Sequence, residues 1–184
     1  MFLSVNHEML DALHILLGTV QAEVPLKALQ TAASNGKLQI LRIILSISSE
    51  EQIEAAFTQG DAILQEPIAN GSEMVVTLYL RLGTPVTSNL LHTAAVNGRI
   101  NIIEMLLQAK NSASVREALK APFIAGAALQ SGNHQALLRL LQAGTEIQAS
   151  DIVESVRESS ESVVRILQRG CVTFPKDAMQ AAIE

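Results

Sequence analysis

Aromatic side chains are scarce in this chain. Its 184 residues include no Trp, one Tyr and four Phe, although 48% of the residues are hydrophobic. The apolar content is therefore Leu, Ile, Val and Ala, which suits helices that pack closely on other helices. A chain of this length can bury a sizeable core. The composition favours a helical protein.

Cysteine and basic residues are also scarce. The single cysteine, Cys171, excludes an internal disulfide and fits a reducing compartment. The 13 Lys and Arg are spread along a chain of net charge −5, which argues against binding to nucleic acid or to an anionic membrane. No apolar run approaches the ~18 residues of a membrane span. The first 20 residues carry Glu8 and Asp11 and lack the basic leader of a signal peptide. We therefore expect a cytoplasmic protein.

A repeated segment organises most of the chain. LQTAASNGKLQILRIIL (29–45), LQEPIANGSEMVVTLYL (64–80) and LHTAAVNGRINIIEMLL (91–107) align without a gap. AGAALQSGNHQALLRLL (125–141) follows the same frame, and VESVRESSESVVRILQRG (153–170) is a decayed fifth copy. Self-similarity with a period of this size indicates supersecondary units that are stacked along the chain.

Each copy carries the signals of a helical hairpin. The first helix ends in small residues and then in a dipeptide such as Asn97-Gly98, because Gly, and Asn less readily, accept the left-handed conformation that ends a helix. The second helix, such as 38–45, has an apolar face too wide for one partner and must be buried between neighbouring units. The sequence thus predicts an all-α helical-repeat solenoid with about five repeats.

The third copy, NLLHTAAVNGRINIIEMLLQA (89–109), resembles an ankyrin repeat. Leu91, His92 and Ala94 occupy the slots of that family's T-P-L-H-x-A signature. The resemblance extends over most of the chain after the first 25 residues and is weakest in the fifth copy. Gln replaces the His in the first two copies, and Pro67 falls inside a first helix. The alternative architecture is a solenoid of helical hairpins from another family.

The connectors between copies alternate in length. The short connectors, 83–89 and 144–151, leave little room for the family's projecting hairpin, whereas the long connectors, 48–59 and 114–121, look helical. We therefore expect extra helices and few or no strands. Each long connector begins with a Ser that precedes a Glu by three residues, the pattern of a capping box: Ser48 with Glu51, and Ser114 with Glu117.

Both ends of the chain carry a prediction. Residues 1–24 are expected to form an N-terminal capping helix, which would close the stack as terminal units do. Residues 25–184 are expected to form a single ankyrin-like repeat domain. The segment DAMQAAIE (177–184) matches the first helix of a partial sixth repeat. We expect a monomer, with self-association through this C-terminal edge as the alternative.

Few residues suggest chemistry. His7, Asp11 and His14 share a helix face at i, i+4 and i+7 and could bind a metal, but a solvated polar face is favoured. His92 resembles the structural histidine of ankyrin repeats. Cys171 follows a glycine in a turn, where an inert buried thiol is favoured over a nucleophile. The sequence predicts no catalytic residue, metal ligand or cofactor, and therefore no enzyme.

The resemblance implies a protein–protein interaction module that holds a protein partner on its concave side. First helices and the connectors before them line that side. One alternative is an N-terminal targeting or regulatory solenoid of a larger enzyme, or of a bacterial effector that acts in the host cytosol; the other is an enzyme contained in these residues. The predicted partner-binding positions are Thr31, Ser34, Thr87, Ser88, Thr93, Val96, Gln130, Gln148 and Ser150.

Overall fold

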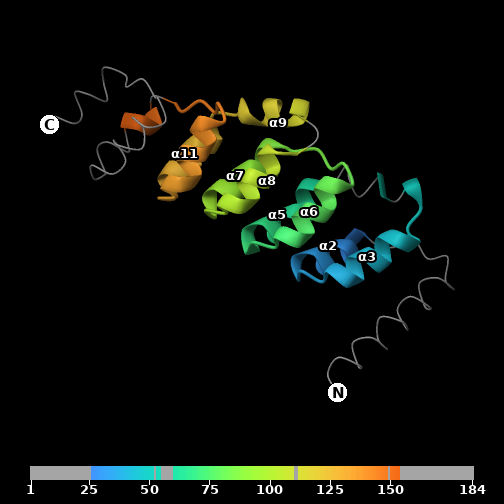
Figure 1. The fold of residues 1–184 in the computed structure, drawn as a ribbon. Coiled ribbons are helices and arrows are strands. Elements are labelled where there is room, and N and C mark those ends of the chain that lie inside the picture. The colour runs from blue at the N-terminus through green and yellow to red at the C-terminus, as the bar shows by residue number, and fades with distance from the viewer. Residues whose placement is uncertain (1–25, 52, 55–59, 110–111, 149, 154–184) are drawn as a thin grey trace. The chain divides into compact units, whose positions relative to one another are not determined.

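The computed structural model describes residues 26–51, 53–54, 60–109, 112–148 and 150–153 (Figure 1). All regular structure in these ranges is α-helix, which confirms the all-α prediction for this part of the chain. None of the described helices is long and apolar enough to cross a membrane. The predicted capping helix, the fifth and sixth copies, Cys171 and the group of His7, Asp11 and His14 lie outside the described residues, apart from the first residue of the fifth copy.

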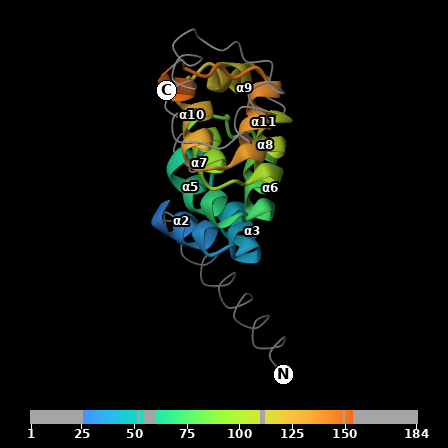
Figure 2. The ribbon, with the colours of Figure 1, turned by 90° about the vertical axis from the view of Figure 1, so that its left-hand side faces the viewer.

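The chain divides into two compact units, Met1–Thr84 and Pro85–Glu184, which we call unit 1 and unit 2. Unit 1 contains two helical hairpins, and the first helix of one packs along the first helix of the other. The first hairpin consists of α2 (Leu26–Ser34) and α3 (Leu38–Ile47), and the second of α5 (Gly60–Asn70) and α6 (Glu73–Arg81) (Figure 2). The buried core of unit 1 includes Leu29, Leu41, Leu64, Val76 and Tyr79.

Unit 2 also contains two hairpins, with one extra helix between them. The hairpins are α7 (Ser88–Val96) with α8 (Ile100–Leu107), and α10 (Phe123–Gln130) with α11 (His134–Gln142). Helix α7 packs on α10 and α8 packs on α11, while α9 (Ser112–Leu119) packs on α7 and α8. The fully buried side chains of unit 2 include Leu91, Ile103, Leu106, Ile124 and Leu137.

One turn geometry joins the two helices of all four described hairpins. In the α7–α8 turn, the Gly98 amide donates to the Ala95 carbonyl (3.1 Å) and the Arg99 amide donates to the Ala94 carbonyl (2.9 Å), which is a Schellman motif. The Ile100 amide then donates to the Gly98 carbonyl (3.0 Å), so that Arg99 is the centre of an inverse γ-turn. The other three turns repeat these bonds, and the four glycines have φ between +61° and +79°. The predicted helix ends are therefore confirmed at Gly36, Gly71, Gly98 and Gly132.

The long connectors contain helices, but the predicted capping boxes are wrong. Ser48 ends α3, and its hydroxyl donates to the Ile44 carbonyl (2.7 Å). The next helical bond joins the Ile53 amide to the Ser49 carbonyl, so Ser49 stands at the start of that segment. Ser114 lies inside α9, where its hydroxyl accepts from the Val86 amide (3.2 Å). Neither Ser48 nor Ser114 therefore caps the helix that its Ser-x-x-Glu pattern predicts.

Candidate partner-binding face

The first helices of unit 2 present two neighbouring rows of accessible side chains. Residues spaced by four and then three positions share one face of a helix. Helices α7 and α10 pack together, and the rings of His92 and Phe123 meet edge to face with centroids 5.5 Å apart. This surface is the α7–α10 face, defined as Asn89, Thr93 and Val96 on α7 with Phe123, Ala127 and Gln130 on α10, all of them exposed or half-buried.

Burial of the opposite side of α7 determines which of its residues face outward. On α7, Leu90, Leu91 and Ala94 are fully buried, so the remaining side of the helix must face outward. The Thr87 hydroxyl accepts from the Leu90 amide (3.4 Å) and caps the start of α7. The Thr93 hydroxyl donates to the carbonyl of Asn89 one turn earlier (2.9 Å). The backbone of α7 is thus held at its start and buried along one side.

The second hairpin of unit 2 clamps the end of α7. The Asn133 amide nitrogen Nδ2, at the start of α11, donates to the carbonyls of Ala95 (3.0 Å) and Val96 (2.5 Å). These are carbonyls of the last turn of α7, which have no partner within the helix. An ion pair between Arg139 on α11 and Glu104 on α8 joins the second helices (2.5 Å). The second hairpin of unit 2 is therefore bonded to both helices of the first, to α7 through Asn133 and to α8 through Arg139.

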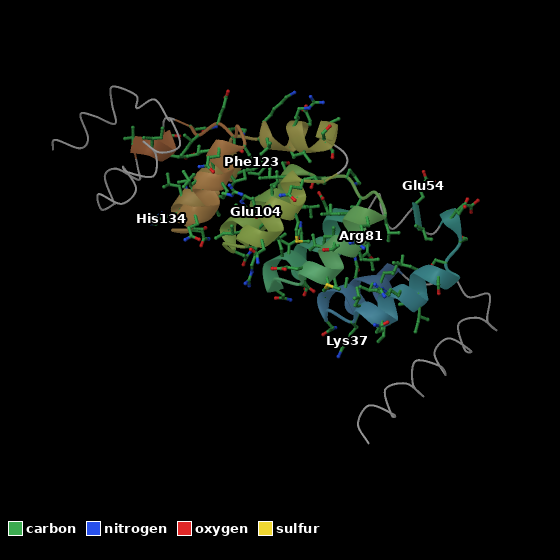
Figure 3. All side chains as sticks on the ribbon, in the orientation of Figure 1. Lys37, Glu54, Arg81, Glu104, Phe123 and His134 are labelled. Atoms are coloured by element: carbon green, nitrogen blue, oxygen red, sulfur yellow. The ribbon has the colours of Figure 1, made fainter. Side chains whose placement is uncertain are left out.

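Phe123 is the most accessible aromatic side chain of the described residues. The Phe123 side chain is 46% exposed. In the repeat alignment, Phe123 occupies the position on α10 that Asn89 occupies on α7. Phe123 is the first residue of α10, whereas Glu104 and His134 belong to the second helices α8 and α11; all three side chains are labelled in Figure 3. Phe123 is not among the predicted partner-binding positions, although Gln130 at the end of the same helix is. An aromatic residue at an outward helix position of a chain this poor in aromatics was the signal available.

The first and second helices of the two hairpins in unit 2 differ in charge. Neither α7 (SNLLHTAAV) nor α10 (FIAGAALQ) contains Asp, Glu, Lys or Arg. The second helices, by contrast, carry Glu104 and Arg139 as a partly exposed pair. The α7–α10 face is therefore formed by uncharged side chains within these two helices.

Unit 1 presents an equivalent but chemically different surface. The α2–α5 face is defined as Thr31 and Ser34 on α2 with Glu66 and Ala69 on α5. Thr31 and Glu66 are exposed, and the Ser34 hydroxyl donates to the Gln30 carbonyl (2.9 Å). The same hairpin frame thus carries a carboxylate here, at the position of Ala127 in unit 2.

The structure brings some of the predicted positions together and separates others. Thr93, Val96 and Gln130 lie on the α7–α10 face, whereas Thr31 and Ser34 belong to unit 1. Partner binding at these positions stays a prediction. The other four positions lie in or beside connectors: half-buried Thr87 and Ser88 at the start of α7, and exposed Gln148 and Ser150 after α11.

Three buried polar groups of the described residues belong to neither face. Burial raises the pKa of the fully buried Tyr79 phenol to about 12. The hydroxyls of Thr84 and Thr145, each directly after a glycine that ends a second helix, are buried without a hydrogen-bond partner. No group of three or more His, Cys, Asp or Glu among the described side chains is arranged to hold a metal ion.

A scan against protein-family models found no match, and neither the curated proteins nor the solved structures that were searched gave a significant match. The resemblance to ankyrin repeats accordingly remains a prediction from the sequence.

Proposed function

We propose that this chain is a protein–protein interaction module of ankyrin type, and that it binds a protein partner through the outward faces of its first helices. Binding, rather than catalysis, is its activity in this proposal. A monomer that works in the cytoplasm remains the expected form.

One observation carries the proposal: a repeated frame presents chemically different side chains at equivalent outward positions. The turns at the four described hairpins have the same backbone geometry. At one outward position of the first helices, however, the four hairpins carry Thr31, Glu66, Thr93 and Ala127. Stacked helical hairpins with a constant frame and a variable face are the usual construction of repeat proteins that recognise other proteins. Fold alone does not identify the partner.

The proposal is tested by affinity purification of the tagged chain from cells that produce it naturally. The double variant Thr93→Arg with Val96→Arg places two charges on the first helix of unit 2. The matched control, Asn101→Arg with Gln135→Arg, places two charges on the second helices of the same unit. We expect at least one co-purifying protein to be lost from the first-helix variant and retained by the control, with equal thermal midpoints. If no co-purifying protein distinguishes the two variants, binding does not occur through the first helices.

A further inference from the structure

We propose that the α7–α10 face binds an uncharged, apolar segment of the partner protein, and that Phe123 makes the main contact. This inference rests on the proposed function and adds to it a region, an anchoring residue and the chemistry of the partner. The juxtaposition that carries it is an exposed phenylalanine, braced by His92, on two packed helices that contain no charged side chain.

The distribution of charge points to an uncharged partner. The chain has 13 Lys and Arg and 18 Asp and Glu, yet α7 and α10 contain none of them. The centres of protein interfaces are depleted in charged residues and enriched in aromatic ones. A partner charge that was buried against this face would lose its hydration and find no opposite charge on either helix. The carboxylate nearest to α10 is that of Asp151, which lies against Gly126, so a partner carboxylate is disfavoured most. An uncharged contacting segment avoids these costs.

The side chains around Phe123 suit an aromatic anchor. Its ring is 46% exposed, so a partner can remove much apolar area from water. Its neighbour one turn along α10 is Ala127, which leaves the side of the ring open. The edge-to-face contact with His92 holds the ring in one orientation, so little side-chain freedom is lost on binding. Aromatic residues, Phe included, are enriched at protein interfaces, where a few residues carry most of the binding energy.

A different protein is favoured over a second copy of this chain as the occupant. Each copy carries a net charge of −5, and like net charges oppose association. A symmetric contact through this face would gain no compensating ion pair from α7 or α10, because those helices have no charge to pair. The occupant is therefore an apolar segment of another protein.

The test is a selection from a phage-displayed library of random 16-residue peptides against the immobilised full chain, with counter-selection on Phe123→Ala. Enriched peptides are then synthesised, and their affinities are measured by fluorescence anisotropy. We expect peptides whose central residues are aliphatic or aromatic and uncharged. Phe123→Ala and Thr93→Glu should each weaken binding at least tenfold.

Two matched controls locate the effect. Gln135→Glu places the same charge at an exposed position of α11 in the same unit, and Met74→Ala removes an exposed apolar side chain (61% exposed) from α6. Each control should change the affinity less than twofold, and all four variants should keep the circular dichroism melting curve of the wild type. Thr93→Glu keeps the test decisive if Phe123→Ala does not fold.

Several outcomes would overturn the inference. These are enriched peptides with charged centres, an equal loss of affinity in Gln135→Glu and Thr93→Glu, or a selection that yields no peptide dependent on Phe123. A wild-type dimer in sedimentation equilibrium that Phe123→Ala dissociates would assign the face to a second copy instead. Each of these results leaves the proposed function intact if the natural partner is still lost from the Thr93→Arg, Val96→Arg variant.

Discussion

The two units differ in how the second hairpin meets the turn of the first. In unit 1 the side chain that faces Gly36 is Ser72, whose hydroxyl lies 3.6 Å from the place that a Cβ on Gly36 would take. In unit 2 the corresponding residue is Asn133, whose Oδ1 lies only 2.6 Å from the place of a Cβ on Gly98. Asn133 also donates two hydrogen bonds to the end of α7. A single longer side chain thus turns a packing contact into a hydrogen-bonded clamp.

The two units share one turn geometry, while the clamp and the exposed row change from one unit to the other. Unit 2, with the clamp, also carries the uncharged face. A clamped frame holds α7 and α10 in fixed register, which favours a binding surface that loses little freedom when a partner docks.

The largest effect is expected from the core, at a position that both units fill with a large side chain. Leu106 in unit 2 and Tyr79 in unit 1 are equivalent in the repeat and are both fully buried. Leu106→Ala should lower the free energy of unfolding by about 2–5 kcal/mol, because it leaves a cavity in a packed interior. Chemical denaturation monitored by circular dichroism measures this. Leu82→Ala, at a side chain that is 41% exposed, is the control and should cost much less; equal costs would contradict the assigned core.

Replacement of the turn glycines by alanine should lower the free energy of unfolding by different amounts in the two units. Gly36, Gly98 and Gly132 have φ of +63°, +61° and +70°, and alanine in that region costs roughly 1–2 kcal/mol. Gly98→Ala must in addition displace Asn133 and its two hydrogen bonds, each worth about 1 kcal/mol. Gly98→Ala should therefore destabilise the protein by about 3–4 kcal/mol, more than Gly36→Ala.

Gly132→Ala is the control for strain alone, because nothing lies within 4 Å of a Cβ at that site. The double variant Gly98→Ala with Asn133→Ser gives unit 2 the residue of unit 1 and should cost less than the sum of its single variants. Additive costs would show that Asn133 does not bear on Gly98.

Alkaline pH should act on unit 1 through Tyr79, the only tyrosine of the chain. Burial raises its pKa to about 12 from the ordinary value of 10.0. The unfolded chain therefore releases this proton at lower pH than the folded protein does, so this contribution to stability is complete below pH 10 and is lost as the pH rises toward 12. Phenolate absorbance at 295 nm reports the titration directly. Tyr79→Phe should remove this part of the pH dependence, and a folded-state titration near pH 10 would contradict the burial of the phenol.

The smallest effect is expected at the two buried threonines, one in each unit. Thr84 and Thr145 are 3% and 4% exposed, and their hydroxyls have no hydrogen-bond partner. Valine has nearly the same shape and removes the unpaired hydroxyl, so Thr84→Val and Thr145→Val should each raise stability by about 1 kcal/mol. Thermal denaturation measures both. A loss of stability in either variant would indicate that a water molecule satisfies that hydroxyl.

The sequence predicts the hairpins better than it predicts what joins them. The Asn-Gly dipeptides and the apolar spacing locate the helix ends because both are local signals, which depend on left-handed φ and on one face of a helix. The capping boxes at Ser48 and Ser114 were wrong: Ser48 ends α3, and Ser114 lies inside α9, whose apolar face is buried. Asn133 and Phe123 were not identified either, since their roles depend on which side chains a neighbouring hairpin brings to them.

Site-specific photocrosslinking in cells tests the central claim most directly, namely that binding follows the variable face of the first helices. A photoreactive amino acid replaces one residue at a time at Thr93 and Ala127 on the α7–α10 face, and at Asn101 and Gln135 on the second helices. The account predicts that Thr93 and Ala127 crosslink to the same protein and that Asn101 and Gln135 do not. Crosslinks to a common partner from Asn101 and Gln135, with none from Thr93 and Ala127, would contradict it.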